Sequence, residues 1–295
     1  MSQFAQVTIY GLLQGGLLAL VAVGFSLVWG VMNVVNLAHG AFVVAGAYIA
    51  WEINRAVGLD PFLAMVPTAI VLFGLGYVIQ RGLVNLVVNA PIFITLLLTF
   101  GLNLLLVNGM ILLYKANTQT IDTSYATKGL VLPGGVHVPY GRLIGAAIAI
   151  AVTLALGLLV RRTRLGLSIL ATGMDRGAAR LMGIRAAHIY AVTFGLAAAM
   201  AGIAGAAVGT VSPFSPADAG RFTLFSFVAA VLGGLGNTSG ALYGGLLLGL
   251  VESWGGLLLP NTLINAVAFG VVVIVLLVRP QGLAGRSFYA SRVEV

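Results

Sequence analysis

The chain has 295 residues, of which 60% are apolar and only 7% are charged, and its mean hydropathy is +1.08. Soluble domains carry about 25% charged residues, so this chain has too few charges to cover a surface that faces water. The composition excludes a soluble globular protein and predicts an all-α, polytopic integral membrane protein with one transmembrane domain.

The net charge of +8 and the absence of cysteine narrow the possible functions further. The basic residues are concentrated in a few loops, where they set the orientation of a membrane protein, so we expect a lipid bilayer and no nucleic acid as a partner. A chain without cysteine has no disulfide and no thiolate metal site. It also lacks the P-loop, HExxH and GxSxG patterns, so no enzymatic activity, cofactor or metal is expected.

Nine apolar segments separated by polar turns follow one another along the chain, and each is a candidate for a span of about 20 residues. The seventh segment is short and either crosses the bilayer at a thinned point or enters it and returns, so eight or nine spans are predicted. The polar stretch 115–141 is expected to form an external loop or a short hairpin. The nine segments are residues 7–31, 37–51, 62–80, 91–114, 142–160, 189–211, 222–236, 240–259 and 263–278.

The distribution of lysine and arginine predicts the orientation of these spans. If the basic loop 161–188 is cytoplasmic and the spans alternate, ten basic residues lie inside and five lie outside, which is the asymmetry expected of a membrane protein. With nine crossings the N-terminus is then periplasmic and the C-terminus cytoplasmic. The inner set is Arg81, Arg161, Arg162, Arg164, Arg176, Arg180, Arg185, Arg279, Arg286 and Arg292.

The basic loop 161–188 also contains a candidate helix. Asp175 can cap it, and Gly183 can end it. Ala178, Leu181 and Met182 would form a small apolar face at helical spacing, with Arg176 and Arg180 on the polar side. A short amphipathic helix of this kind either lies on lipid headgroups or docks against a partner protein.

The segments 25–52 and 225–252 align without gaps and share seven of 28 residues, which predicts a weak internal repeat. Each copy is interrupted by polar residues, and paired interrupted segments in two halves indicate a transport pathway. The alternative explanations are hydrogen bonds between helices, ordinary turns at the bilayer surface, and an acid that reaches the interface. The candidate pathway residues are Asn33, Asn36, His39, Asn237, Thr238, Ser239 and Glu252.

Five segments of the chain together resemble one family, the permease subunits of branched-chain amino acid ABC importers of the LivH type. They occur in the order of the family and extend over most of the chain, and the NLAHG and RPQGL pieces are the most specific. The segments are GFSLVWGVMNVVNLAHGAFVVAGAYIA at 24–50, DRGAARLMGI at 175–184, TFGLAAAMAGIAG at 193–205, FVAAVLGGLGNTSGALYGGLLLGLVE at 227–252 and RPQGLAG at 279–285.

The resemblance implies a subunit of a bacterial inner-membrane importer for branched-chain amino acids. Its partners would be two cytoplasmic ABC ATPase subunits, a second related permease chain and a periplasmic substrate-binding protein. The short helix of the basic loop would receive the motion of the ATPases. The residues that the resemblance assigns to this coupling are Asp175, Arg176, Ala178, Ala179, Arg180, Met182 and Gly183.

Two alternatives to branched-chain amino acid import remain open from the sequence. Within the class, the chain could be the permease of a related importer for urea, short amides or another small polar solute. From another class, a secondary transporter or channel would explain the spans and the interruptions, but it would not explain a docking helix in a basic loop.

Overall fold

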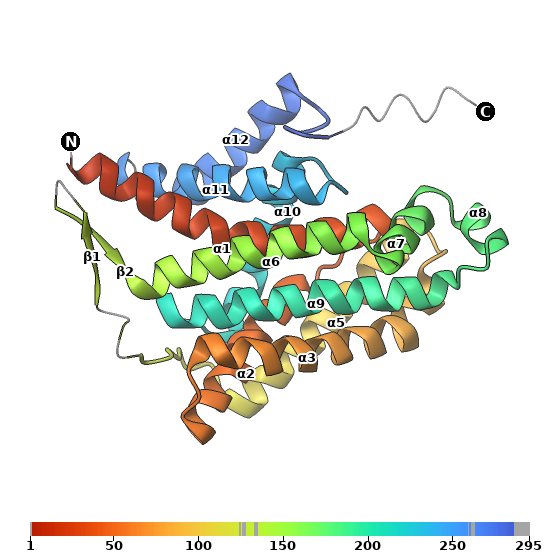
Figure 1. The fold of residues 1–295 in the computed structure, drawn as a ribbon, viewed down its shortest axis with the longest axis horizontal. Helices are drawn as coiled ribbons and strands as arrows, with labels where there is room; N and C mark the ends of the chain where they lie inside the picture. The colour runs from red at the N-terminus through yellow and green to blue at the C-terminus, as the bar shows by residue number, and fades with distance from the viewer. Residues whose placement is uncertain are drawn as a thin grey trace.

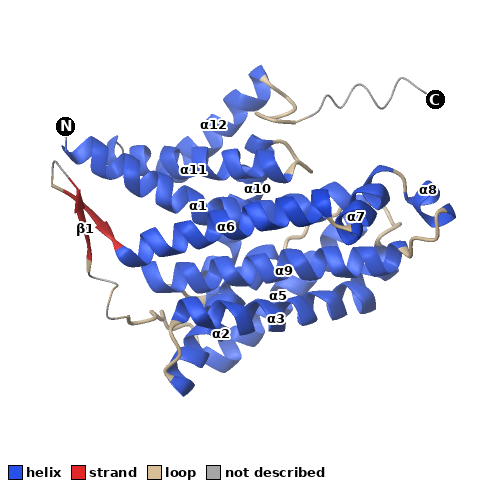
Figure 2. Cartoon of the chain, viewed as in Figure 1, coloured by secondary structure: helices blue, strands red, loops and turns tan. Residues whose placement is uncertain are grey.

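The computed structural model describes residues 2–123, 125, 128–132, 135–258, 260 and 263–285. Within them the fold is a bundle of helices with one small hairpin, which confirms the all-α prediction (Figures 1 and 2). The helices are α1 Ser2–Met32, α2 His39–Val57, α3 Pro61–Ile79, η1 Gln80–Val84, α4 Asn85–Val87, α5 Ile92–Tyr114, α6 Tyr140–Arg162, α7 Arg164–Met174, α8 Arg176–Leu181, α9 Ala186–Val211, η2 Pro216–Asp218, α10 Ala219–Gly233, α11 Thr238–Leu258 and α12 Ile264–Val278.

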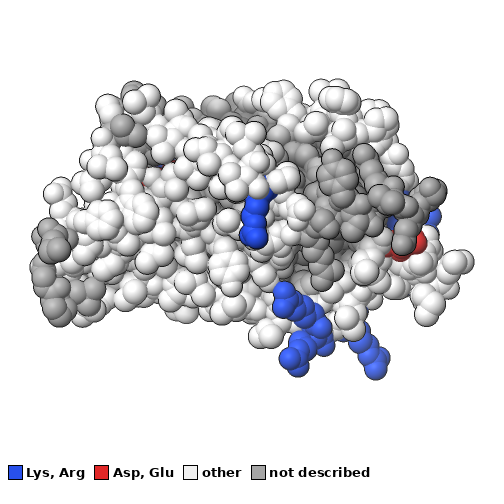
Figure 3. Space-filling view, turned by 90° about the horizontal axis from the view of Figure 1, so that it is seen from above, with Lys and Arg blue, Asp and Glu red and all other residues white. Residues whose placement is uncertain are grey.

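Six of the described helices are long and apolar enough to cross a membrane, and α12 adds a shorter apolar helix. A chain with this many apolar helices is a polytopic membrane protein. The predicted segment 37–51 lies largely in α2, and the short segment 222–236 lies largely in α10. Figure 3 shows that charged side chains are sparse over most of the face that it presents.

Two helix boundaries differ from the expected ones. Helix α1 begins at Ser2 and not near Val7, because its polar first turns continue the same backbone pattern. The third segment does not stop at Arg81, since η1 and α4 continue the helix to Val87. A charged side chain at the membrane surface interrupts burial but not backbone hydrogen bonding, so it is a poor guide to where a helix ends.

Hydrogen bonds between distant segments define two ends of the bundle. At the hairpin end, β1 (Gly129–Leu132) pairs antiparallel with β2 (Val136–Pro139), which is the short hairpin expected between 115 and 141. There Gln6 exchanges two hydrogen bonds with the backbone of His137, at 2.7 and 2.8 Å. The hydroxyl of Tyr125 donates to Asp60 at 2.5 Å, and burial together with this bond raises the pKa of Tyr125, so the hydroxyl remains a donor.

The other end of the bundle carries α8, as Figure 1 shows, and will be called the α8 end. It is tied together by Tyr77 and His188, whose polar atoms lie 3.0 Å apart, and by Arg161, which donates to Ser239 at 2.9 Å. Of the basic residues expected on the inner side, Arg286 and Arg292 lie outside the described residues.

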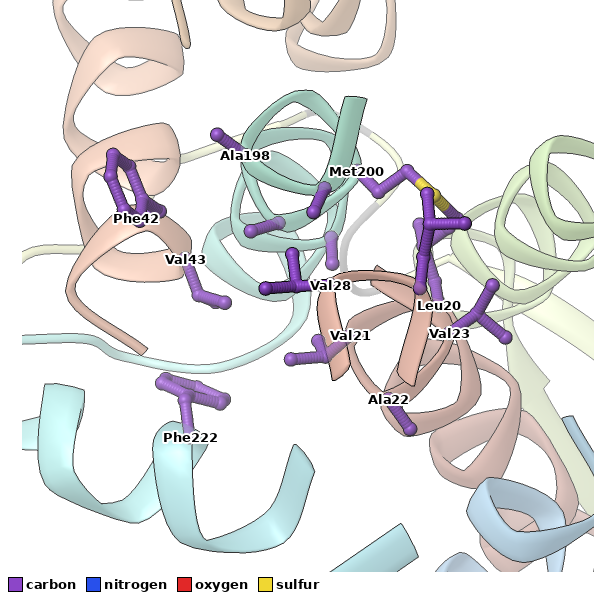
Figure 4. Close-up of a cluster of buried hydrophobic side chains, with 14 of the residues drawn as sticks. Leu20, Val21, Ala22, Val23, Val28, Phe42, Val43, Ala198, Met200 and Phe222 are labelled. Carbon is purple, nitrogen blue, oxygen red and sulfur yellow. The ribbon is translucent and has the colours of Figure 1, made fainter. Parts of the chain in front are cut away.

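Helix α1 runs through the centre of the bundle and is almost entirely buried from Leu17 to Val28. Figure 4 shows its side chains between those of α2, α9 and α10. The labelled residues are Leu20, Val21, Ala22, Val23 and Val28 of α1, Phe42 and Val43 of α2, Ala198 and Met200 of α9, and Phe222 of α10. Residues 33–38, a non-helical segment that will be called the first break, therefore begin at the end of the most buried long helix.

Glycines bring α1 and α11 into backbone contact. A Cβ atom added at Gly245 would lie 2.3 Å from the Cα atom of Ala19, and one at Gly249 would lie 2.4 Å from the Cα atom of Gly15. Close approach through small residues is a common way for helices to associate in membranes. Lipid is as apolar as the side chains, so the hydrophobic effect does not drive this association and close packing does.

Candidate functional site

The basic loop folds into two helices, of which the sequence predicted only the second. Thr163 caps α7 by accepting a hydrogen bond from the amide of Gly166 at 3.0 Å. Asp175 follows α7 and caps α8, accepting from the amide of Ala178 at 3.0 Å. Gly183 has a φ of 80° and lies just beyond α8. The cap and the stop that the sequence indicated are therefore both present.

Three large apolar side chains of the basic loop are exposed. Met174, Leu181 and Met182 are 85%, 90% and 82% exposed. Ala178 is exposed as well, whereas Ala179 is 3% exposed and packs inward. Large exposed apolar side chains on a capped helix form a surface for a partner or for lipid.

Arg176 and Arg180 do not share the polar side on which the sequence placed them. Arg180 is exposed, but Arg176 is half-buried and turns toward the bundle. Its guanidinium donates to the side-chain oxygen of Asn89 and lies 5.8 Å from the ring centre of Tyr190. The difference arises because a six-residue helix has only one buried row, and α8 presents Arg176 and Ala179 to its neighbours.

The first break is a non-helical segment, residues 33–38, that joins α1 to α2. It starts at Asn33, whose φ of 54° is unusual for a residue other than glycine. Asn36 is 2% exposed, and its side-chain oxygen accepts from the amide of Ala38 at 3.1 Å. Asn36 therefore shapes the entry to α2 from within the protein.

Two threonines from other helices contact carbonyl groups of the first break, those of Val35 and Leu37. The hydroxyl of Thr99, on α5, lies 3.0 Å from the oxygen of Val35 and 3.1 Å from that of Leu96. The hydroxyl of Thr223, on α10, lies 3.1 Å from the oxygen of Leu37 and accepts from the amide of Gly40. Buried non-helical backbone needs such partners, because its carbonyl groups are removed from water.

Removing the hydroxyl of Thr99 is expected to lower stability. Thr99→Val takes away the side-chain donor to Val35 and should cost about 0.5–1.5 kcal/mol, the usual range for one hydrogen bond. The measurement is the midpoint of thermal unfolding in detergent. Thr99→Ser, which keeps the hydroxyl, is the matched control and should unfold close to the original protein; equal loss in both variants would contradict the assignment.

His39 is a buried structural residue at the start of α2. It has no exposed surface, and its Nε2 donates to the carbonyl of Val21 at 2.9 Å. Its ring lies edge-on to Phe25, with ring centres 5.7 Å apart. These contacts tie α2 to α1.

Asn33 differs from the other residues of the first break because it is exposed. It lies in the wall of a pocket between the end of α1 and the turn that precedes α5. The pocket is lined by Trp29, Met32, Asn33, Val34, Val88, Ala90, Ile92 and Thr95. Asn33 is therefore the residue of the first break that is placed to meet a solute or water.

The second break, residues 234–237, is a tight turn between α10 and α11. Gly234 and Gly236 have φ values of 103° and 81°. The side-chain oxygen of Asn237 accepts from the amides of Ser239 and Gly240 at 3.0 and 3.1 Å, so it caps α11. Ser239 accepts from Arg161, and Thr238 and Ser239 are half-buried.

A strap formed by residues 279–285, after α12, completes the second break. The amides of Leu283 and Ala284 donate to the carbonyls of Leu232 and Gly233 at 2.8 and 3.1 Å. The side chain of Asn237 donates to the carbonyl of Ala284 at 2.6 Å. The strap thereby supplies partners for the last carbonyls of α10, which the end of a helix leaves unpaired.

Glu252 has a basic neighbour inside the bundle. Its side chain is 11% exposed and lies 3.8 Å from the guanidinium of Arg221, which is 56% exposed. Glu252 and Arg221 therefore form an ion pair between α11 and α10. Glu252 lies several helical turns beyond Ser239 on α11, so the structure does not bring it to the second break.

Both breaks and the basic loop meet at the end of α1. A Cβ atom at Gly30 would lie 2.8 Å from the Cα atom of Gly236, and one at Gly173 would lie 2.9 Å from the carbonyl oxygen of Gly30. The sequence missed this contact, and it missed Thr99, Thr223 and Asn89. Glycines and threonines are so frequent in membrane helices that only the fold distinguishes these positions.

Comparisons with known proteins agree with the resemblance seen in the sequence. The family described as branched-chain amino acid transport system / permease component matches residues 7–278. The high-affinity branched-chain amino acid transport system permease protein BraD of Pseudomonas aeruginosa is 32% identical, with 96% of each chain covered. LivH of Escherichia coli K12 is 28% identical, again with 96% of each chain covered.

A relative named for another solute is also similar. The ribose import permease protein RbsC of Escherichia coli K12 is 27% identical over 87% of this chain and 79% of its own. No solved structure matches the chain. Because the family model covers nearly the whole chain and BraD exceeds 30% identity, the chain belongs to the family of branched-chain amino acid transport system permease components.

Proposed function

We propose that the chain is the membrane-spanning subunit of an ATP-driven importer for branched-chain amino acids, with leucine, isoleucine and valine as substrates. The observation that supports it best is the capped helix α8 with exposed apolar side chains at one end of an apolar bundle. Two ABC ATPase subunits, supplied by other chains, bind this surface and use ATP. The chain itself has no catalytic residues.

The α8 end is cytoplasmic in this proposal, and the hairpin end faces the periplasm. The basic loop and Arg279 then lie on the inner side, as the positive-inside rule requires. The N-terminal half of α1, which contacts the hairpin through Gln6, lies on the outer side. A periplasmic binding protein delivers the substrate there, and a second, related permease chain completes the pathway.

The two breaks supply the moving parts of the transport cycle. Each is a short non-helical segment held by another part of the chain, the first by threonines of α5 and α10 and the second by the strap, and both contact Gly30 or its neighbours. Asn33 and the pocket beside it contribute to the cytoplasmic mouth of the pathway. A secondary transporter would need no exposed apolar helix in a basic loop, so the ABC assignment explains more of the molecule.

An acidic residue at the exposed tip of α8 should disrupt binding of the ATPases. Leu181→Glu places a charge on a surface that is buried in the complex, and we expect the affinity for the ATPase subunits to fall about tenfold or more. Co-purification and titration with the ATPases measure it. Val131→Glu, at the hairpin, is the matched control because Val131 is also exposed, and it should bind normally.

Uptake measured with the cognate ATPases and binding protein tests the substrate. Labelled leucine should enter, and uptake should stop when ATP is withheld. Preferential uptake of urea or ribose would keep the ABC assignment and replace the substrate. Uptake that continues on an ion gradient without the ATPases would contradict the ABC assignment itself.

A further inference from the structure

The side chain of Arg176 points in the opposite direction from the rest of the docking surface. Arg176 is the first residue of α8, next to the cap Asp175, but its guanidinium reaches into the bundle and donates to Asn89. Asn89 lies in the short turn between α4 and α5, and Pro91 opens α5. One side chain therefore joins the helix that meets the ATPases to the beginning of a membrane helix.

Helix α5 is the long helix that the rest of the chain holds least firmly. Only 17% of its apolar stretch is buried, against 83% for α9. Its buried residues, Thr95, Thr99, Leu102 and Met110, form one narrow row that faces the first break and α2. A helix held along one row can shift relative to the bundle at lower cost than one that is enclosed.

The pocket at the first turn of α5 leaves room for such a shift. Val88 and Ala90, on either side of Asn89, line it together with Asn33 and Val34 of the first break. One turn further along α5, the hydroxyl of Thr99 contacts the carbonyl of Val35. The start of α5 thus contacts Arg176 on one side and the first break on the other.

The ring of Tyr190, on α9, provides the fixed side of this arrangement. The guanidinium of Arg176 lies 5.8 Å from the centre of that ring, within the range of a cation–π contact. Asn85 and Tyr77 attach the segment before Asn89 to the start of α9 through Ala187 and His188. Arg176 therefore contacts the enclosed helix α9 on one side and the turn before the loosely held helix α5 on the other, so it can act as a pivot between them.

We propose that Arg176 is a positioning residue that transmits the displacement of α8 to α5, and through Thr99 to the first break. The inference rests on the proposed function, because it needs ATPases that move α8. It assigns different tasks to the two arginines of α8: Arg180 faces the partner, and Arg176 faces the membrane helices. Asn89 becomes part of the coupling machinery.

The test compares Arg176→Ala, Asn89→Ala and the double variant in the full complex with its ATPases, second permease chain and binding protein. The expected result is that all three assemble and that uptake per ATP hydrolysed falls about tenfold, a usual size for coupling between sites. The double variant should be no worse than either single variant, because both remove the same contact. Arg162→Ala, which changes an exposed arginine outside α8, is the control and should behave like the original protein.

A thiol reporter in the pocket separates a coupling role from a structural one. The chain has no cysteine, so Ala90→Cys introduces a single reactive thiol beside the first break. Its labelling rate should change when ATP is added, and this change should disappear in Arg176→Ala. A change that persists in Arg176→Ala, or a normal ratio of uptake to hydrolysis, would overturn the proposal.

Two further outcomes are informative in different ways. If Arg176→Ala prevents assembly with the ATPases, Arg176 contacts the partner directly. The proposal that it transmits motion from α8 to α5 is then wrong, while the proposed function stands. If the unaltered chain assembles with no ATPase, the proposed function fails, and this inference fails with it.

Discussion

Replacing Gly40 by alanine is expected to force α2 away from α10 and to prevent the protein from folding normally. A Cβ atom at Gly40 would lie 1.9 Å from the carbonyl oxygen of Ala219 and 2.5 Å from the amide nitrogen of Thr223. Both atoms belong to the backbone of α10, so no side chain can rotate to make room. The helices must separate, which also breaks the hydrogen bond from the Gly40 amide to Thr223.

The expected loss for Gly40→Ala is about 3 kcal/mol or more, at the upper end of the cost of overpacking. The measurement is the yield of monodisperse protein in detergent and the midpoint of its thermal unfolding. Gly74→Ala is the control, since Gly74 lies within α3 and a Cβ atom there meets nothing within 4 Å. That change should stay within about 1 kcal/mol. A folded, stable Gly40→Ala protein would contradict the packing of α2 on α10.

The sequence predicts the helical framework well because lipid imposes strong constraints on it. Apolar length identifies the spans, as for α5, α6 and α9, and the cap residue Asp175 and the glycine at 183 identify the ends of α8. These signals are local in sequence, so they can be recognised without knowledge of the fold. Helix α7 was missed although Thr163 caps it, because its sequence, RLGLSILATGM, is too short for a span.

The roles of the polar residues near the breaks could not be predicted in the same way. A polar residue in an apolar segment shows that a partner is required, but it does not show whether the partner is a solute or the backbone. His39, Asn36 and Asn237 all bond to backbone groups of the chain, whereas Asn33 lies in a pocket wall. Only the path of the chain decides between these possibilities.

The sequence also does not show which way each side chain of a short helix points. Arg176 and Arg180 are four residues apart and therefore lie near one another on an ideal helix. The structure separates them because Arg176 stands at the first position of α8, where its long side chain can turn back toward α9 and Asn89. The functional difference between the two arginines follows from that position.

The RPQGL segment identifies the family in the sequence, but its structural role is visible only in the fold. No local feature of this segment predicts which part of the chain it contacts. In the structure it is the strap, and its backbone bonds to the end of α10 while Asn237 bonds to it. The C-terminal part of the chain is thereby joined to the second break, although Asn237 and Ala284 are 47 residues apart in sequence.

Removal of the Asn237 side chain should therefore have two separate effects. Asn237→Ala leaves the amides of Ser239 and Gly240 without their cap and the carbonyl of Ala284 without its donor. Loss of a helix cap costs about 1 kcal/mol, and an unpaired buried group adds roughly 1–3 kcal/mol. We expect a clear fall in the midpoint of thermal unfolding and faster proteolysis within the strap.

Asn237→Asp separates these two effects. Aspartate keeps an oxygen that accepts from Ser239 and Gly240, so α11 stays capped, but it has no amide group to donate to Ala284. This variant should free the strap to proteolysis as Asn237→Ala does, with a smaller fall in thermal stability. If proteolysis of the strap is unchanged in both variants, the backbone bonds of Leu283 and Ala284 alone hold the strap. Asn237 would then serve α11 and not the junction between the second break and the C-terminal segment.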